Sequence, residues 1–394
     1  MRRHKYEILI AGAGVAGLTS AIALNRAGHT VNVFERQERI QPLGAGLILW
    51  SNAVKALRAI NLEDALADIG QPLAQLSILD SGGNTLSQTD ARLISEKARA
   101  ATLAVHRADL MELLLTKLPA GTLHTGHKLT EFEQNGRRVT AHFADGSHRI
   151  GNILIGADGI WSTVRAQVHG DIPPRYSGYT AWRAVSRNPD IERFGTGHST
   201  ESWGAGARFG WVPLTDGRVY WFAVKNALEG QMAGSGGHRK ELLELFGNWH
   251  SPIPETIEAT PGVTILRNDI YDRPPIPNWG DGAVTLAGDA AHSMTPNTGQ
   301  GAAQAIEDGV VLADCLNRYV TIEAALRAYE RARGPRTRVI TELSHRIGRM
   351  AQLENPTLGG IRNLVTKLTP DSIARRQIQE IVDWQAPILG KEEE

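Results

Sequence analysis

The stretch that most constrains this chain is residues 6–35, where a short apolar strand, a glycine-rich turn, a helix and a second strand follow one another. Residues 6–11 are rich in aliphatic side chains and lead directly to Gly12, Gly14 and Gly17. The second strand ends at Glu35. This succession is typical of the first unit of a doubly wound α/β fold, so it predicts a parallel sheet with a nucleotide at its edge.

The three glycines and the acid predict which kind of nucleotide binds. Gly12 permits a tight turn, Gly14 lets the backbone approach a pyrophosphate, and Gly17 lets the helix pack closely on the strand. The first turn of that helix presents unpaired N–H groups and the positive end of its dipole. Glu35 can accept hydrogen bonds from ribose hydroxyls and disfavours a 2′-phosphate, so we expect FAD or NAD rather than NADP at this turn.

The composition excludes several other classes of protein. The 42 basic and 42 acidic residues cancel, so no nucleic-acid or polyanion partner is indicated. The single cysteine, Cys315, cannot form an internal disulfide, which favours a reducing cytoplasm, and we expect it to be a small buried apolar side chain. The apolar run near the N-terminus is too short for a signal peptide or a membrane span. We therefore expect a cytoplasmic monomer or homodimer without a metal site.

Two further motifs lie in the middle of the chain. Residues 152–157 predict a buried strand that ends at Asp158 and leads into a helix near Arg165. Ligands bind beside an acid at such a strand end, although a plain turn is an equally good interpretation. Arg107 opens another predicted helix and could pair with a pyrophosphate, but taken alone a surface arginine is favoured. Residues 129–150 predict a β-meander.

The character of the chain changes between residues 173 and 275, where antiparallel strand patterns and aromatic residues gather. A sheet with much aromatic surface suits a flat apolar substrate, whereas ordinary sheet core should account for at least half of these side chains. Residues 74–88 alternate around a turn and predict a hairpin outside the nucleotide fold. Four tryptophans mark the aromatic stretch: Trp182, Trp203, Trp211 and Trp221.

A second decisive stretch begins at residue 282, where a buried strand ends at Asp289 and a loop leads into a helix over residues 302–316. Asp289 can hold a ribityl hydroxyl, and the amides of residues 299–302 can face an electron-rich ring edge. Glu307 and Asp308 are interpreted as helix-face residues rather than catalysts. His292 is interpreted as a hydrogen-bonded loop histidine in preference to a proton relay.

With these motifs in this order and spacing, the chain resembles the class A FAD-dependent aromatic monooxygenases, the p-hydroxybenzoate hydroxylase-like group. The resemblance rests on residues 12–17, on Asp158-Gly159 within residues 155–165, and on Gly288-Asp289 followed by Pro296 and residues 299–301. It covers nearly the whole chain. It implies an α/β fold in which a Rossmann-type FAD domain holds an inserted antiparallel substrate domain and is followed by C-terminal helices from about residue 322 to residue 384.

The resemblance also implies roles for individual residues. Glu35 would bind the adenosine ribose, Arg107 the FAD phosphates or ribityl region, and Asp289 the ribityl chain. Asp158 and Arg165 would belong to a motif associated with both FAD and NAD(P)H. The full expected set of cofactor-binding residues is Gly12, Gly14, Val15, Ala16, Gly17, Glu35, Arg36, Gly46, Arg107, Leu129, Asp158, Asp289, Gly299, Gln300, Gly301 and Ala302.

The implied domains are discontinuous in sequence. We expect an FAD-binding domain at residues 1–75, 101–172 and 276–345, a substrate domain at residues 76–100 and 173–275, and a C-terminal helical region at residues 346–394.

The chemistry that the resemblance implies is oxygen transfer. In this family NAD(P)H reduces the FAD, O2 adds to give a flavin C4a-hydroperoxide, and its distal oxygen passes to an electron-rich ring. The chain would thus hydroxylate or epoxidise a small aromatic or heteroaromatic compound, with NADH or NADPH as co-substrate and no second dinucleotide fold. The alternatives are an FAD-dependent reductase or oxidase without oxygen transfer, and a non-catalytic flavin-binding protein.

The spacing of Arg208 and Tyr220 is similar to that in the flavin-dependent urate hydroxylase branch, where an arginine and a tyrosine twelve residues apart serve the substrate. The resemblance implies that Arg208 orients or polarises the substrate and that Tyr220 hydrogen-bonds it, while a strand-end arginine and a core tyrosine are an equally good interpretation. Further candidates for the substrate pocket are Arg183, Trp203, Trp211, Phe222 and Pro296.

Trp50 is a departure from the family pattern, because related enzymes commonly have a smaller residue or a proline there. This leaves the shape of the pocket near the flavin open. Salicylate, hydroxybenzoate, hydroxynicotinate and urate hydroxylases and carotenoid epoxidases share the framework, and the fold does not choose among them.

Overall fold

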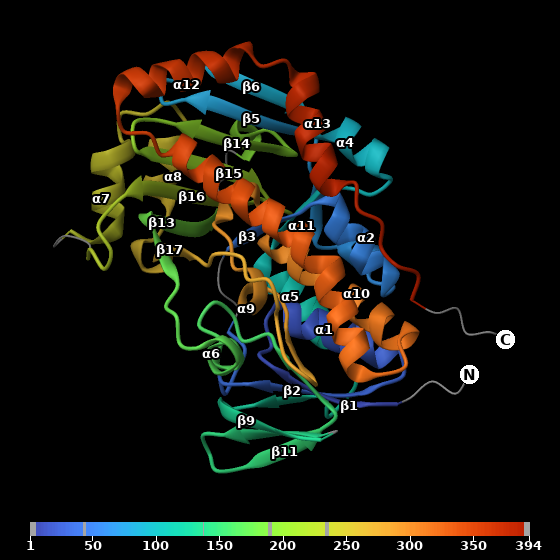
Figure 1. Cartoon of the computed structure of the whole chain (residues 1–394). Helices are drawn as coiled ribbons and strands as arrows, with labels where there is room; N and C mark the ends of the chain where they lie inside the picture. The colour runs from blue at the N-terminus through green and yellow to red at the C-terminus, as the bar shows by residue number, and fades with distance from the viewer. Residues whose placement is uncertain (1–4, 42–44, 137, 188–190, 233–235, 390–394) are drawn as a thin grey trace.

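The computed structural model describes residues 5–41, 45–136, 138–187, 191–232 and 236–389, so the outer ends of the first and last expected domain ranges lie outside the described residues. Within this part of the chain the strands form four sheets, which Figure 1 shows with their covering helices. Across the same residues, no helix combines the length and apolar character needed to cross a bilayer.

A five-stranded parallel sheet forms the centre of the nucleotide-binding part. Its strand order is β18-β12-β1-β2-β8, and its register places Ala11 beside Gly156 and Gly156 beside Leu286. The carboxyl ends of β1, β12 and β18 therefore meet at one edge, which confirms the predicted parallel sheet. The strands are β1 (Glu7–Ala11), β2 (Thr30–Glu35), β8 (Leu123–Thr125), β12 (Ile153–Gly156) and β18 (Val284–Leu286).

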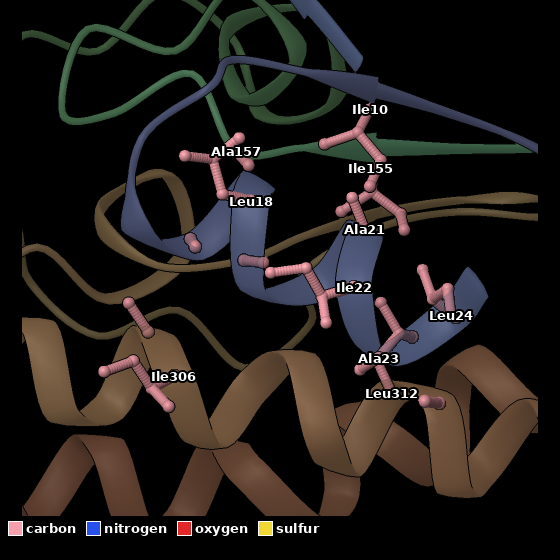
Figure 2. Close-up of a cluster of buried hydrophobic side chains, with 14 of the residues drawn as sticks. Ile10, Leu18, Ala21, Ile22, Ala23, Leu24, Ile155, Ala157, Ile306 and Leu312 are labelled. Carbon is pink, nitrogen blue, oxygen red and sulfur yellow. The ribbon is translucent and has the colours of Figure 1, made fainter. Parts of the chain in front are cut away.

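Helix α1 (Val15–Arg26) lies between this sheet and helix α10 (Gly301–Arg318), as Figure 2 shows. Ala21 of α1 lies beside Ile155 of β12, and Ala23 faces Leu312 of α10 (Figure 2). All four side chains belong to the main hydrophobic core. The small residues of α1 therefore allow it to contact a sheet on one side and a helix on the other.

Gly309 sets how closely α10 packs on α1. A Cβ atom at this position would lie 2.7 Å from the backbone nitrogen of Ser20. We expect Gly309→Ala to lower the free energy of unfolding by about 1–3 kcal/mol, measured by urea denaturation of the apoprotein, because the two backbones must move apart. Gly360→Ala is the control, since a Cβ atom there meets nothing within 4 Å. It should be neutral or stabilising by up to about 1 kcal/mol, and equal effects of the two changes would contradict this account.

Two small sheets and several helices complete this part of the molecule. The meander predicted at residues 129–150 is confirmed as the sheet β11-β10-β9, and β3-β7-β4 forms the other small sheet. Their strands are β3 (Gly46–Leu49), β4 (Gly70–Pro72), β7 (Leu103–His106), β9 (Leu129–Asn135), β10 (Arg138–Phe143) and β11 (His148–Gly151). The helices are α2 (Ser51–Ala59), α3 (Glu63–Ala67), α4 (Ala91–Ala98), α5 (Arg107–Thr116), α6 (Thr163–His169) and α9 (Asp289–His292).

The aromatic stretch forms a seven-stranded sheet of order β17-β13-β16-β15-β14-β5-β6. Its neighbouring strands are antiparallel, as predicted, except that β5 and β14 pair in parallel. The hairpin predicted at residues 74–88 is β5 and β6, and it joins this sheet. The strands are β5 (Gln75–Asp80), β6 (Thr85–Asp90), β13 (Arg175–Arg187), β14 (His198–Trp203), β15 (Ala207–Pro213), β16 (Arg218–Asn226) and β17 (Leu266–Asp272).

One face of this sheet is an ordinary hydrophobic core. Trp182, Trp211 and Trp221 pack there with side chains of helices α7 (Gly237–Phe246) and α8 (Ile253–Ala259). This confirms that sheet core accounts for at least half of the four tryptophans. Because side chains alternate along a strand, Arg208 and Tyr220 lie on the opposite face.

Three helices end the chain, as predicted. Helix α11 (Ile322–Ala351) is continuous across the boundary expected at residue 345 and runs diagonally from α10 to the seven-stranded sheet (Figure 1). Helix α12 (Pro356–Leu368) and helix α13 (Asp371–Val382) follow, and α12 crosses the top of that sheet beside β6. The remaining short elements are η1 (Ile191–Phe194), η2 (Gly262–Thr264) and η3 (Pro296–Thr298).

Candidate functional site

The carboxyl ends of β1, β12 and β18 form a cradle lined by two glycine-rich backbones. Gly12 has a φ of +100°, and a Cβ atom there would lie 2.4 Å from the carbonyl oxygen of Ala157. Gly17 is equally tight, since its Cβ atom would meet the carbonyl oxygen of Gly12. At Gly14, by contrast, nothing lies within 4 Å. The turn is therefore packed on its inner side and open on the side where a pyrophosphate is expected.

Glu35 stands at the end of β2 against this turn. Its Oε2 accepts a hydrogen bond from the backbone N–H of Ala13 at 2.9 Å, and its Oε1 accepts one from Gln37 at 2.9 Å. The two contacts fix the carboxylate beside the turn while each oxygen keeps a second lone pair free. Arg36, the next residue, is exposed.

Asp158 follows β12 and caps helix α6. Its Oδ2 accepts hydrogen bonds from the backbone N–H groups of Thr163 and Val164, at 2.8 and 3.3 Å. Its Oδ1 is buried and has no partner among the described residues. Burial raises the pKa of this carboxyl group. An unpaired buried acceptor of this kind is a position where a ligand hydroxyl or amide can donate.

Arg165 is hydrogen-bonded to the protein backbone through its guanidinium group. Its Nη1 donates to the carbonyl oxygens of Ala290 and Ala291, at 2.9 and 3.1 Å. Burial lowers its pKa to about 10. The structure therefore places Arg165 as a tie between α6 and α9, the helix that begins at Asp289.

The charges of Asp289 and Arg107 interact in the cradle. Asp289 follows the buried strand β18, yet its side chain remains accessible. Enclosure by the protein raises the pKa of its carboxyl group, although His292 and Arg107 act in the opposite direction. Burial and the nearby Arg183 lower the pKa of Arg107, which Asp289 partly restores. An accessible acid deep in the fold, with a cation near it, is the arrangement that a polar ligand chain would fill.

The loop between α9 and α10 closes the cradle. Gly299 has a φ of +63°, and a Cβ atom at Gly301 would meet nothing within 4 Å, so the start of α10 is open. Gln300 points inward instead, where its Oε1 accepts a hydrogen bond from Asn52 at 3.0 Å. Pro296 is exposed and Ala302 is half-buried. The N–H of Gly299 donates to the carbonyl oxygen of Pro296 at 3.0 Å, and the side chain of Gln300 holds the loop in place. The backbone that stays open to a ring edge is therefore that at the start of α10.

A buried charge network lies behind this loop, and it was not predicted from the sequence. Glu307 and Asp308 were interpreted as helix-face residues, but both are fully buried. Arg333 of α11 pairs with both carboxylates, and its Nε lies 2.7 Å from Oδ1 of Asp308. Arg336 lies 2.8 Å from Glu307, and His292 Nε2 lies 2.6 Å from Oδ2 of Asp308. His292 is thus hydrogen-bonded, as expected, although its Nδ1 has no partner among the described residues.

Arg208 is tied to three different segments of the chain. Its Nη1 donates to Oε1 of Glu201 at 2.9 Å, its Nε to Oε1 of Gln352 at 2.8 Å, and its Nη2 to Oδ1 of Asn297 at 2.8 Å. The side chain is 2% exposed. Asn297 belongs to the cradle loop and also donates to the hydroxyl oxygen of Tyr179 at 3.0 Å. Two hydrogen bonds of Asn297 therefore join the cradle directly to the seven-stranded sheet.

Other expected pocket residues share the face of Arg208. Strand register places Arg183 opposite Phe222 and Val185 opposite Tyr220, so Arg183, Tyr220 and Phe222 face the same side. Arg183 donates to Asn268 at 3.0 Å. Burial raises the pKa of the Tyr220 hydroxyl group, and the charge of Arg183 opposes this shift. Trp203 lies on this face too, but under Arg362 of α12 at 5.1 Å from the ring centre.

Three residues expected at the pocket or the cofactor site have other surroundings in the structure. Trp211 lies on the opposite face, where its ring packs 6.0 Å from that of Phe194. Leu129 belongs to the main hydrophobic core. Gly46 contacts the seven-stranded sheet, since a Cβ atom there would lie 2.4 Å from the ring of Tyr220.

The cradle fits FAD by the chemistry of its residues. It offers an open glycine turn at a helix N-terminus, an anchored acid beside it, the unpaired Oδ1 of Asp158, the accessible Asp289 and an open loop before α10. The glycine turn, the anchored acid, Asp289 and the loop match a pyrophosphate, a ribose, a ribityl chain and a ring edge respectively, and Oδ1 of Asp158 can accept one further hydrogen bond. Among the described residues, no group of three metal-ligating side chains is close enough to hold a metal ion.

Comparison with known proteins gives consistent results. The family described as "FAD binding domain" matches residues 5–235 and 267–344. Aurachin C monooxygenase/isomerase of Stigmatella aurantiaca is 40% identical over 94% of this chain and 97% of its own length. FAD-dependent urate hydroxylase of Klebsiella pneumoniae is 33% identical over 84% of this chain and 87% of its own length.

Solved structures agree with the sequence comparison. Klebsiella pneumoniae HpxO complexed with FAD and uric acid aligns with a TM-score of 0.91 and 28% identity, over 97% of each chain. A salicylate hydroxylase substrate complex aligns with a TM-score of 0.79 and 21% identity, over 97% of this chain and 96% of that one, which supports the fold.

Proposed function

The chain belongs to the family of FAD-dependent monooxygenases that share this FAD binding domain, and we propose that it uses NADH or NADPH and O2 to oxygenate a small aromatic or heteroaromatic ring. The observation that carries the proposal is the hydrogen bond from Arg208 to Asn297, at 2.8 Å. It places the substrate sheet directly against the loop on which the ring edge of the flavin is expected.

Each part of the cradle has a task in this proposal. The turn at Gly12 and Gly14 and the N-terminus of α1 bind the pyrophosphate, Glu35 binds the adenosine ribose, and Asp289 binds the ribityl chain. Arg107 neutralises negative charge near Asp289. When bound, FAD accepts electrons from the nicotinamide nucleotide and activates O2. The residues around it must hold the ring, exclude water and orient the substrate.

Tyr220 and Arg208 serve the substrate in this proposal. The ring of Tyr220 packs on Gly46 of β3, which holds it between the two domains. Arg208 spends three of its five N–H groups on Glu201, Gln352 and Asn297, so two remain for an acceptor atom on the substrate. We propose that Tyr220 hydrogen-bonds the substrate and that Arg208 orients it.

Arg208→Ala should leave FAD bound but impair coupled hydroxylation. The expected loss of product per nicotinamide nucleotide consumed is about tenfold or more, because the variant lacks both the remaining donors and the tie to the cradle loop. Product and peroxide would be measured together, and peroxide should rise. Arg338→Ala is the matched control, since that arginine forms only an exposed pair with Glu342. Unchanged product yield in Arg208→Ala would remove Arg208 from the mechanism.

The function itself is tested by nucleotide oxidation on the FAD-loaded protein. NADH and NADPH are offered with a panel of phenols, hydroxybenzoates, hydroxypyridines, quinolones and purines, under 18O2. Stimulated oxidation with little peroxide and an 18O-labelled product is the expected result. Substrate conversion without label would indicate a reductase or oxidase. Bound FAD with no nucleotide oxidation in the presence of any compound would indicate a non-catalytic flavoprotein.

A further inference from the structure

Trp50 joins the cradle to the substrate sheet and has an unused hydrogen-bond donor. It stands at the end of β3, immediately before helix α2, and is 8% exposed. Its indole packs with Ile94 of α4 and Val382 of α13. Its Nε1 is buried and has no hydrogen-bond partner among the described residues. A buried N–H group without an acceptor is unfavourable, so this donor would be stabilised by an acceptor from outside the chain.

The donor edge of this indole lies at the cradle loop. A Cβ atom built on Gly299 would lie 3.1 Å from Nε1 of Trp50. Gly299 belongs to the segment whose amides are expected to meet the ring edge of the flavin. The N–H of Trp50 is therefore at the place where the flavin and the substrate would meet.

The surface next to this donor is apolar. Ile48 and Leu76 pack against Trp50 on one side and belong to the cluster of Val212 and Tyr220 on the other. Both are only half-buried, although they lie between two domains. Side chains that retain free surface in such a position form a wall suited to an apolar ring.

Two arginines, Arg208 and Arg183, lie on the face of the sheet that carries Tyr220. The guanidinium of Arg208 is paired with the carboxylate of Glu201 at 2.9 Å. Arg183, the other cation near Tyr220, donates to the neutral amide oxygen of Asn268 at 3.0 Å, and its charge repels that of Arg107. No described acidic or basic side chain forms a hydrogen bond or ion pair with Trp50. A carboxylate placed against the apolar side chains of Ile48 and Leu76 would therefore lose hydration without gaining a contact with a cation at Trp50.

We propose that the N–H of Trp50 donates a hydrogen bond to a ring carbonyl oxygen or a pyridine-type nitrogen of an uncharged, largely apolar heteroaromatic substrate. This inference rests on the proposed function and names the substrate class of the same site. Trp50 is then a positioning residue that selects rings with an acceptor and disfavours carboxylates. A carbonyl of the flavin has the same chemistry as such a substrate, so the experiment must separate the two sources.

The test compares Trp50→Phe with the wild-type holoenzyme. Binding of 2-methyl-4-quinolone, an uncharged bicyclic carbonyl compound, is titrated by the change in flavin absorption without any nucleotide. We expect a Kd about tenfold higher in Trp50→Phe, with FAD affinity and the ligand-free flavin spectrum unchanged. Trp50→His, which keeps a ring N–H, should recover part of the affinity. Wild-type protein should bind the quinolone more tightly than salicylate or urate.

Trp211→Phe is the matched control. Its indole Nε1 also lacks a partner among the described residues, but it lies on the opposite face of the sheet. It should leave quinolone affinity unchanged. Equal quinolone affinity in wild type and Trp50→Phe would overturn the inference. Weakened FAD binding or a shifted ligand-free spectrum in Trp50→Phe would assign the donor to the flavin and overturn it as well, as would tighter binding of salicylate or urate than of the quinolone.

The outcome for this inference is distinguishable from that for the proposed function. Trp50-dependent quinolone binding without any stimulated nucleotide oxidation would support the binding site and contradict the oxygenase proposal. Stimulated nucleotide oxidation and oxygen transfer that do not depend on Trp50 would support the oxygenase proposal and contradict the role of Trp50.

Discussion

Replacing Arg333 with alanine is expected to lower the free energy of unfolding of the apoprotein by about 3–5 kcal/mol. The guanidinium is 1% exposed and pairs with two fully buried carboxylates, those of Glu307 and Asp308. Its Nη2 also donates to the backbone and side-chain oxygens of Gln304. Removing it leaves two buried charges without their main counter-ion, which costs far more than the loss of an exposed pair.

Urea denaturation of wild type and variant would measure this difference. Arg338→Ala is again the control, because its side chain is on the same helix and its pair with Glu342 is exposed. That change should alter stability by no more than about 0.5 kcal/mol. A loss of less than about 1 kcal/mol in Arg333→Ala would contradict the network as a source of stability.

The same comparison should depend on pH. Burial by itself raises the pKa values of Glu307 and Asp308, but Arg333 and other neighbours hold both below their ordinary range. A carboxyl group whose pKa is lowered by folding stabilises the protein above its unfolded value of about 4, and this contribution is lost as the pH falls further. Without Arg333 the effect of burial dominates, so these groups take up protons at higher pH. The difference between wild type and variant should therefore be largest near pH 7 and smaller near pH 4.

Asp289→Ala should weaken FAD retention by about 10-fold to 100-fold, because a hydrogen bond to a charged acceptor contributes roughly 1.5–3 kcal/mol. Among the described residues, no side chain is hydrogen-bonded to the carboxylate of Asp289, and the Asp289 side chain is accessible. Its removal should therefore leave the apoprotein as stable as the wild type, within about 0.5 kcal/mol. If Asp289 acted only on the fold, its replacement would lower the stability of the apoprotein and leave FAD affinity unchanged.

FAD fluorescence on dilution would measure retention, and thermal unfolding of the apoprotein would measure stability. Asp314→Ala is a suitable control, since Asp314 pairs only with the exposed Arg318 on the same helix. It should retain FAD like the wild type. Normal FAD affinity in Asp289→Ala would exclude Asp289 from the cofactor site.

The parts of the molecule that follow local rules were predictable from the sequence. Residues 6–35 specified β1, the turn at Gly12, α1 and β2, because each depends on contiguous residues. The hairpin of β5 and β6 followed from alternation in the same way, whereas the C-terminal helices were implied by the family resemblance. Cys315 is buried, as expected, and burial raises its pKa to about 11.

The parts that depend on distant partners were not predictable. Glu201, Asn297 and Gln352 meet at Arg208, but they come from β14, the cradle loop and the end of α11, and no spacing in the sequence links them. Glu307 and Asp308 are adjacent acids in α10, and nothing in the sequence links them to Arg333 and Arg336 of α11. Trp211 was expected in the pocket with Arg208, but it lies on the opposite face of the sheet, in the core that α7 and α8 cover.

Helix α11 has a consequence for exchanging parts between enzymes of this kind. It holds Arg333 and Arg336 against the carboxylates behind the cradle, and immediately after its last turn Gln352 contacts Arg208 on the substrate sheet. At about 1.5 Å per residue, the 19 residues from Arg333 to Gln352 act as a strut roughly 28 Å long. Consider a chimera that takes its seven-stranded sheet from another enzyme but keeps this α11. Gln352 would then no longer lie at the right place to bind the arginine that corresponds to Arg208. Such chimeras should oxidise the nicotinamide nucleotide and form peroxide in place of product, even when the new pocket binds the intended compound.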